Sequence, residues 1–411
     1  MTKPNIAFLE AADRIGSRLC RDAIFADNRC NWIGASKDPV EGVWVALQRS
    51  FAADLYTGTS GIALFLAHLA AHTNDPVHRR TARAAVAHVR KSLPENPAGL
   101  NIGFYLGRVG IAYALIDIDS VLHDEGLADL GLATLRDLPV TLDESTGLDV
   151  MSGCAGAILG LLAVWRRHGE PSLLDLAARL GDHLIEKAHR RNGAWSWSTS
   201  DMPAIDDLAG FSHGAAGIAL SLLELWAITK EPRFRRAAEA GFAYERGVFN
   251  EEHGNWPDFR VSQQLPPSAE RAAGYMIAWC HGAPGIGLSR LRAFQLTGDE
   301  RYRNEAEAAL RTTALSLRDA TAGNFSLCHG VFGNSELLLA VAEIFGDQQH
   351  REVAESTALR ATEHYPKDEH WPCGVPGGGE TPNLMLGLAG IGYHYLRLYD
   401  AHSNPSVLCI S

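Results

Sequence analysis

The sequence predicts an all-α fold, an α/α toroid in which seven helical hairpins form a double ring. The first observation is a Gly-x-x-Gly motif that occurs seven times in 411 residues, at intervals of 49, 46, 61, 68, 48 and 57 residues. The second is that each copy opens an apolar run, whereas charged amphipathic stretches lie between copies. The third is the scarcity of period-2 alternation, which argues against a large sheet. Repeats of this length bury their apolar faces on one another.

Two sets of glycines define the repeat. The leading glycines are Gly58, Gly107, Gly153, Gly214, Gly282, Gly330 and Gly387. Their partners are Gly61, Gly110, Gly156, Gly217, Gly285, Gly333 and Gly390. Each pair is expected where a loop enters a helix, because glycine permits unusual dihedral angles and close backbone approach.

The first part of the chain is expected to supply a single helix and then the first complete helical hairpin. Helical periodicity covers Ile6 to Phe25, and an irregular stretch follows from Asp27 to Gln48. The first motif then opens the apolar run Ile62 to Ala71, and a charged helix covers Val77 to Leu93. We expect residues 1–50 to supply an N-terminal helix and loop that close the outer ring.

The same alternation continues to the end of the chain. Apolar helices begin at the later partner glycines, and amphipathic helices are predicted over Leu173–Arg191, Pro232–Val248, Arg301–Arg318 and Arg351–Tyr365. A helix that is apolar all round must be buried, while an amphipathic helix faces solvent on one side. The apolar helices therefore form the inner ring, and residues 1–411 are predicted to be a single domain.

Composition excludes several classes of protein. The net charge of −11 and the absence of a basic stripe argue against nucleic acid as a partner. No run of eighteen apolar residues is present, so no membrane span is expected. The N-terminal residues lack the apolar core of a signal peptide, which favours a cytoplasmic protein. The seven cysteines show no disulfide framework, so clustered Cys and His indicate a metal or catalytic site.

The two residues before each leading glycine locate the predicted chemistry. They are Tyr56-Thr57, Tyr105-Leu106, Met151-Ser152, Ser212-His213, Cys280-His281, Cys328-His329 and Met385-Leu386. If equivalent positions face one centre, Cys280, Cys328 and either His281 or His329 could bind zinc and leave a fourth position open. Copies one, two and seven carry no ligand-type residue and are expected to be structural.

Two further residues are candidates for proton transfer. His213 occupies the position before the glycine in the fourth copy, and an imidazole there could pass a proton near pH 7. Asp149 lies four residues before Gly153 and could orient a histidine or take part in proton transfer. Its alternative role is to cap a loop or a helix start.

Two other motifs do not fit. The spacing Gly210-x-Ser212-x-Gly214 matches a hydrolase nucleophile elbow, which requires a preceding strand that residues 206–209 do not provide. Residues 387–392 resemble a nucleotide-binding loop and also lack a preceding strand. Neither a serine hydrolase nor a nucleotide-binding protein is expected.

Several stretches together resemble the lanthionine synthetase C-like cyclases, most closely the cyclase domain of class II lanthipeptide synthetases. They run through Asp149–Gly156, Phe211–Gly217, Trp279–Gly282, Leu327–Gly330, Asn255–Asp258 and Pro382–Tyr393, and the resemblance extends from about Phe8 to Leu408. It implies an α/α toroid with Cys280, Cys328 and His329 as zinc ligands. It implies His213 and Asp149 as the proton-transfer pair, with His281 beside the metal as a non-ligand.

The resemblance also implies a reaction and its partners. A zinc-activated cysteine thiol of a dehydrated precursor peptide adds to dehydroalanine or dehydrobutyrine and closes a lanthionine or methyllanthionine ring, as in lanthipeptide antibiotic biosynthesis. The class II enzymes carry a dehydratase region before the cyclase, whereas this sequence begins with the toroid. A separate dehydratase is therefore the expected partner.

Three alternatives remain at this point. The same site could add glutathione or another free thiol to dehydroamino acids. A protein prenyltransferase subunit also activates thiols with zinc, although seven helix pairs and a Cys, Cys, His set count against it. A non-catalytic toroid that binds peptide is the third, and the intact set of candidate residues argues against it.

Overall fold

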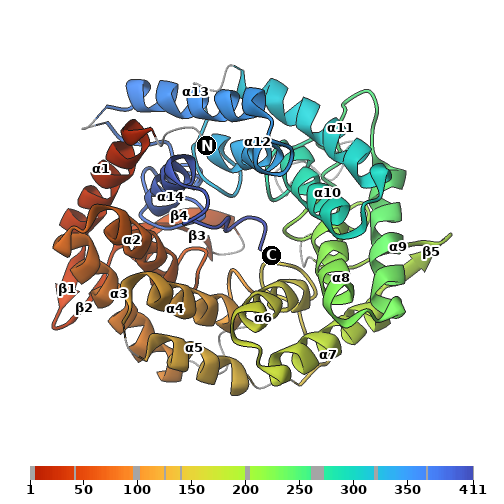
Figure 1. Cartoon of the computed structure of the whole chain (residues 1–411), viewed down its shortest axis with the longest axis horizontal. Helices are drawn as coiled ribbons and strands as arrows, with labels where there is room; N and C mark the ends of the chain where they lie inside the picture. Colours follow the sequence, from red (N-terminus) through yellow and green to blue (C-terminus); the bar gives the residue numbers. More distant parts are fainter. Residues whose placement is uncertain are drawn as a thin grey trace.

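The computed structural model describes residues 5–40, 43–95, 102–124, 126–138, 141–199, 204–260, 273–318, 323–366 and 369–410. Within these ranges the chain forms 14 helices and three two-stranded antiparallel sheets. Figure 1 shows the helices as two concentric rings around a common axis. The predicted α/α toroid with seven helical hairpins is therefore confirmed.

The inner ring consists of the even-numbered helices. They are α2 (Thr59–Thr73), α4 (Arg108–Leu122), α6 (Cys154–His168), α8 (Ala215–Thr229), α10 (Ala283–Thr297), α12 (Val331–Phe345) and α14 (Leu388–Tyr399). Each begins directly after a leading glycine, which is its N-cap residue. Most of their residues are buried, as expected for helices that are apolar all round.

The outer ring consists of the odd-numbered helices, which pack on the inner ones. They are α1 (Ile6–Asp22), α3 (Pro76–Glu95), α5 (Leu127–Arg136), α7 (Pro171–Lys187), α9 (Pro232–Val248), α11 (Glu300–Leu317) and α13 (Gln348–His364). Helix α1 packs on α14 and so joins the two ends of the chain in one hairpin (Figure 1). The short helix α5 lay outside the predicted ranges. None of the helices in the described ranges is long and apolar enough to cross a membrane.

The prediction of an irregular stretch from Asp27 to Gln48 was wrong. The chain there forms two hairpins, from β1 (Ile24–Ala26) with β2 (Arg29–Asn31) and from β3 (Ile33–Val40) with β4 (Val43–Ser50). Residues 46–50 of β4 are all exposed, on both faces of the hairpin. Because these five residues bury neither face, they do not need to alternate between apolar and polar, so this part of the strand lacked the usual pattern.

A third hairpin shortens one predicted helix. Helix α7 ends at Lys187, before the predicted end at Arg191, and the chain continues into β5 (His189–Arg191) and β6 (Ala194–Ser196). Gly193 in the turn between these strands has a φ of +82°, a conformation that favours glycine. The three small sheets agree with the expectation that no large sheet is present.

The partner glycines are required by close packing of each helix start on its own loop. A Cβ placed on any of them would lie 1.5 to 2.3 Å from the carbonyl oxygen of the residue six positions earlier. The shortest of these distances joins Gly110 to Phe104 O, and the longest joins Gly61 to Leu55 O. Each motif is therefore a compact turn that folds back onto the first turn of an inner helix.

Backbone hydrogen bonds join the seven loops into a closed ring. Each link runs from an N–H in one loop to the carbonyl oxygen of the next loop's residue two positions before the leading glycine. The links are Tyr56 N to Tyr105 O (3.0 Å), Tyr105 N to Met151 O (3.1 Å), Val150 N to Ser212 O (3.0 Å), Ser212 N to Cys280 O (3.1 Å), Cys280 N to Cys328 O (3.2 Å), Cys328 N to Met385 O (2.9 Å) and Met385 N to Tyr56 O (3.0 Å). The equivalent positions of all seven repeats are thus brought together.

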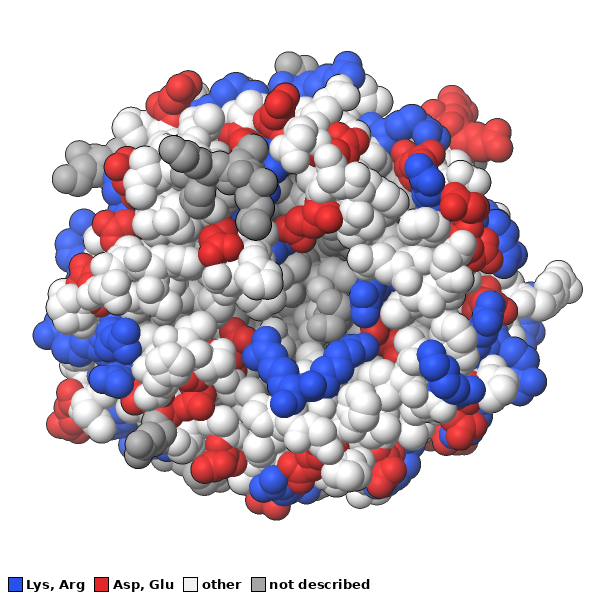
Figure 2. Space-filling model, viewed as in Figure 1, with Lys and Arg blue, Asp and Glu red and all other residues white. Residues whose placement is uncertain are grey.

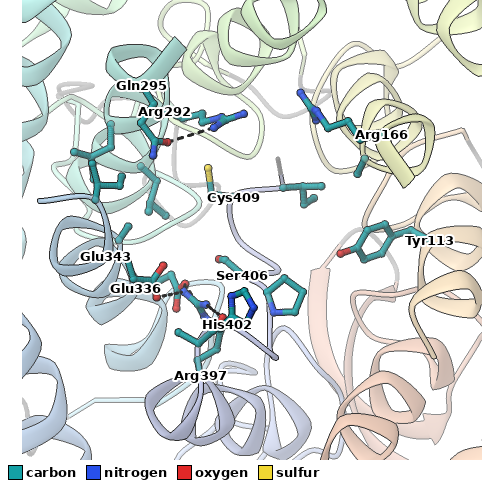
Figure 3. Close-up of a pocket in the computed structure, with 18 of the residues that line it drawn as sticks. Tyr113, Arg166, Arg292, Gln295, Glu336, Glu343, Arg397, His402, Ser406 and Cys409 are labelled. Atoms are coloured by element: carbon teal, nitrogen blue, oxygen red, sulfur yellow. Dashed lines mark hydrogen bonds and ion pairs between the residues drawn. The ribbon is translucent and has the colours of Figure 1, made fainter. Parts of the chain in front are cut away.

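The C-terminal segment fills the centre of the toroid. The Tyr105 hydroxyl donates to Val407 O (2.6 Å), and Trp279 Nε1 donates to Leu408 O (2.9 Å). Beyond this segment a cavity of about 680 Å³ opens on the face shown in Figure 2. Figure 3 shows Arg166 and Arg292 on one side of it and Glu343 on the other, with Cys409 between them. The segment therefore separates this cavity from the loop ring.

The space around each glycine predicts different effects on stability for two glycine-to-alanine substitutions. Gly110→Ala should lower the free energy of unfolding by about 3 kcal/mol, because the added Cβ collides with the backbone of Phe104. Gly247→Ala in α9 meets no atom within 4 Å and should leave stability unchanged or raise it by up to about 1 kcal/mol. Urea denaturation of both variants checks this, and equal effects would contradict the packing argument.

A buried histidine on α14 predicts a pH dependence of stability. Burial lowers the pKa of His394 to about 4, below the ordinary histidine value of 6.5. The unfolded chain therefore binds a proton as the pH falls below 6.5, while the native state resists protonation until about pH 4, so stability is lost in this window. At pH 5 the loss due to His394 should be about 2 kcal/mol, and His394→Gln should lack this component in urea titrations at pH 7 and pH 5.

Candidate metal centre

Two cysteines and a histidine form a compact group at the loop ring. One potential ligand atom from each of Cys280, Cys328 and His329 lies within 4.8 Å of the others. Both cysteines are buried, and His329 is partly buried. All seven cysteines of the chain are free thiols. Two sulfurs and one imidazole nitrogen are a donor set that zinc prefers, and three protein ligands leave a fourth position for substrate.

The ring explains how residues 48 positions apart in the sequence meet. Cys280 and Cys328 occupy the same position in adjacent repeats, and Cys280 N donates to Cys328 O. Gly282, which follows His281, has a φ of +98°, and a Cβ there would lie 1.9 Å from Met276 O. The turn that presents Cys280 therefore requires glycine at this place.

A backbone carbonyl orients His329. Its Nε2 lies 2.8 Å from Gly374 O, in the segment between α13 and α14. A carbonyl oxygen only accepts, so Nε2 carries the hydrogen and Nδ1 retains its lone pair. A hydrogen bond donated by the far ring nitrogen of a histidine to a backbone carbonyl is the usual support for a metal ligand. A Cβ at Gly374 would lie 3.0 Å from Nε2, so a small residue suits this contact.

A hydrogen bond joins the two thiols. The hydrogen bond from Cys328 lowers the pKa of Cys280 well below its usual range, despite burial. The hydrogen bond to Cys280 in turn raises the pKa of Cys328. Burial alone would lower the pKa of His329, but its hydrogen bond with Cys280 raises it. One thiolate is thus already favoured in a buried place, and a cation bound there would favour the second.

His281 lies beside this group and is not part of it. Its Nδ1 is 3.3 Å from Ala209 O, in the neighbouring loop, and its Nε2 is buried without a hydrogen-bond partner among the described residues. Burial lowers the pKa of His281 to about 4, so the imidazole is neutral at pH 7. The structure therefore groups His329, and not His281, with the two cysteines.

His213 and Asp149 form a hydrogen-bonded pair next to His281. His213 Nδ1 lies 2.5 Å from Asp149 Oδ2, and the rings of His213 and His281 stack with centroids 5.9 Å apart. The other carboxylate oxygen of Asp149 accepts from the backbone N–H groups of Ser152 (2.8 Å) and Gly153 (3.1 Å). Asp149 therefore caps the loop and orients the histidine, so both roles considered from the sequence are present at once.

Sequence reasoning missed several residues around the site. Tyr56, in a copy expected to be only structural, is partly buried and hydrogen-bonds with Cys328 through its hydroxyl. Gly374 lies outside every motif and contributes through its backbone, so no side-chain signal exists for it. Arg260 interacts electrostatically with both cysteines, and only its position after Asn255–Asp258 could have drawn attention to it.

Comparison with known proteins identifies the family. Residues 50–409 match the sequence profile described as lanthionine synthetase C-like protein. The chain belongs to the lanthionine synthetase C-like family. This match covers most of the sequence, including all six candidate site residues, and confirms the predicted resemblance.

Three proteins of known function are similar in sequence to this lanthionine synthetase C-like chain. It is 22% identical over 399 residues to the lacticin 481/lactococcin biosynthesis protein LcnDR2 of Lactococcus lactis, covering 93% of this chain and 39% of that protein. It is 23% identical to the nisin biosynthesis protein NisC of Lactococcus lactis, over 69% of this chain and 72% of NisC. It is also 23% identical to the glutathione S-transferase LANCL1 of Danio rerio, over 72% and 71%. The chain thus spans less than half of LcnDR2.

Solved structures support the same fold. Nisin cyclase superposes with a TM-score of 0.67 at 19% identity, covering 87% of this chain and 91% of that one. A family 76 α-mannanase from Bacteroides thetaiotaomicron superposes with a TM-score of 0.52 at 12% identity, over 96% of both chains. At these identities the likeness concerns the toroid alone.

The geometry predicts which cysteine substitution removes the metal. For a zinc ion held by this group, Cys280→Ala should reduce the zinc content from about one per chain to a small fraction, because one of the three grouped side chains is lost. Cys154→Ala is the matched control, since Cys154 is also buried next to a leading glycine but lies outside the group. Elemental analysis of purified protein measures both. Equal zinc in the two variants would refute the ligand set.

Proposed function

We propose that this protein is a zinc-dependent lanthipeptide cyclase that forms lanthionine and methyllanthionine rings in a dehydrated precursor peptide. The observation that carries the proposal is the meeting of Cys280, Cys328 and His329 beside the pair of His213 and Asp149. Family membership and the relatives LcnDR2 and NisC support this function. In this proposal a dehydratase supplies the substrate.

Cys280, Cys328 and His329 would hold the zinc ion. Zinc bound there lowers the pKa of a substrate thiol and keeps its sulfur nucleophilic at neutral pH. Burial of both cysteines excludes water and strengthens electrostatic interactions at the site. The hydrogen bond from His329 to Gly374 O keeps Nδ1 available as a ligand atom.

His213 is the residue proposed to transfer protons. Asp149 accepts from Nδ1–H and therefore fixes the tautomer, which leaves Nε2 to exchange a proton with the substrate. During the reaction a C–S bond forms at the β-carbon, the Cα=Cβ double bond breaks, and the α-carbon gains a proton. With its side chain 35% exposed, His213 is accessible to a peptide, whereas Asp149 is buried. The neutral His281 packed beside it contributes no competing positive charge.

A second candidate function follows from one relative. LANCL1 is described as a glutathione S-transferase and is 23% identical over 304 residues. The same thiol-activating residues would then serve the addition of glutathione to a dehydroamino acid. Incubation with a dehydrated peptide that contains cysteine, with and without glutathione, separates the two functions. A cyclase consumes the peptide thiols without a change in mass, whereas a transferase adds the mass of glutathione.

Substitution of His213 should slow ring closure and leave zinc in place. We expect His213→Gln to lower the rate by about 10²- to 10⁴-fold, the usual contribution of a general acid or base. His350→Gln is the matched control, because His350 also pairs with an aspartate, Asp347, at 2.7 Å but lies on outer helix α13. The linear and cyclic peptides have the same mass, so remaining thiols are alkylated before mass spectrometry. An unimpaired His213→Gln variant would exclude His213 from proton transfer.

A further inference from the structure

An arginine that no motif predicted lies at the edge of the candidate site. Arg260 lies in the segment that follows α9, and hydrogen bonds join this segment to the loop that carries Cys280. Asn255 Oδ1 accepts from Ala283 N (2.9 Å), and Asn255 Nδ2 donates to Met276 O (3.0 Å). The position of Arg260 is therefore tied to that of Cys280.

The guanidinium of Arg260 is held in a fixed orientation. Its Nε lies 2.9 and 3.1 Å from the two carboxylate oxygens of Asp258, and its Nη2 lies 2.6 Å from Oδ2. The backbone of Asp258 pairs with Gly274, and Phe259 O accepts from Ile205 N (2.9 Å). Since Asp258 occupies Nε and Nη2, Nη1 is free of hydrogen bonds to the described residues and is available to a ligand. The Arg260 side chain is 25% exposed, so a substrate can reach it.

The charge of Arg260 acts on the residues of the site. Its Nη2 lies 3.8 Å from Met276 Sδ, four residues before Cys280. Arg260 also interacts electrostatically with Cys280 and Cys328. A permanent positive charge thus borders the place where a thiol and its acceptor would meet.

The proposed reaction needs such a charge. When a thiolate sulfur bonds to the β-carbon, the π electrons of the Cα=Cβ bond move to the carbonyl oxygen, which becomes an enolate oxygen. His213 is proposed to transfer a proton, and Cys280, Cys328 and His329 are proposed to bind the metal. None of these residues is therefore left to neutralise the enolate oxygen. A preorganised donor aimed at developing charge is usually a large catalytic contribution.

We propose that Arg260 is a catalytic residue that donates a hydrogen bond to the carbonyl oxygen of the dehydroamino acid and stabilises the enolate. This role rests on the proposed cyclase function. The electron pair returns to the α-carbon when that carbon takes a proton, and the thiol proton is given up to a base, so the product is an isomer of the substrate. Asp258 serves as a positioning residue that keeps the guanidinium fork in place.

The test compares Arg260→Gln with two further variants. Arg301→Gln is the matched control, because Arg301 makes the same bidentate contact with Asp299, at 3.1, 3.0 and 2.6 Å, on an exposed face of α11. Arg260→Lys keeps the charge and loses the planar fork. For each variant, zinc content, the thermal unfolding midpoint, and kcat and KM for ring closure in a dehydrated peptide are measured.

We expect Arg260→Gln to lower kcat and kcat/KM equally, by about 10²- to 10³-fold, with zinc and unfolding midpoint unchanged. Arg260→Lys should retain an intermediate rate, and Arg301→Gln should match wild type. A wild-type rate in Arg260→Gln would overturn the role of Arg260 and leave the cyclase function intact. A folded, zinc-loaded wild type that closes no rings would overturn both.

If Arg260→Gln loses zinc or fails to fold, the Arg260→Lys variant tests the role of Arg260 instead. A lysine variant that retains zinc and folding but closes rings at least about tenfold more slowly supports a contact with the substrate, since lysine lacks the planar fork. A lysine variant that cyclises at the wild-type rate overturns the proposal. Parallel loss of zinc in the lysine variant also overturns it, because Arg260 would then only hold the site together.

Discussion

The closed ring of seven backbone hydrogen bonds is the interaction on which the rest of the structure depends. Each repeat contributes one loop to it, and the partner glycine lets that loop lie against the first turn of its helix. The ring closes because every loop presents an N–H group to one neighbouring loop and a carbonyl oxygen to the other. Variation in repeat length, from 46 to 68 residues, is therefore confined to segments outside the loops, such as hairpin β5–β6.

The ring also explains how equivalent positions in different repeats come together in one candidate site. Its residues face a common centre, so two adjacent copies with cysteine place two thiols together without any local sequence motif. Their surroundings differ, because His329 hydrogen-bonds with Cys280 and Tyr56 with Cys328. The hydroxyl of Tyr56, from the first repeat, forms a further hydrogen bond with Cys328.

Asp54 and Asp149 make equivalent capping contacts in two repeats, and Asp149 makes one contact more. In the first repeat, Asp54 Oδ1 accepts from the N–H groups of Thr57 (2.7 Å) and Gly58 (3.2 Å) and so caps its loop. Asp149 makes the equivalent contacts in the third repeat and, with its second oxygen, also holds His213. Since the capping contacts fix the carboxylate, the orientation of His213 follows from the same turn that forms the ring.

The sequence by itself determined the toroid, the seven hairpins and the candidates for the site. Periodic glycines and uniformly apolar helices are local patterns, and repetition makes their meaning unambiguous. The repeat pattern left His281 and His329 as equal candidates, and the resemblance to the cyclases indicated His329. The tertiary structure gives the physical reason, since both histidines follow a cysteine and differ in which carbonyl they meet, that of Ala209 or that of Gly374. It alone placed Tyr56 and Arg260 at the site, because long-range contacts leave no spacing in the sequence. The second half of β4 was missed for a different reason, since residues 46–50 are exposed on both faces and carry no alternating pattern.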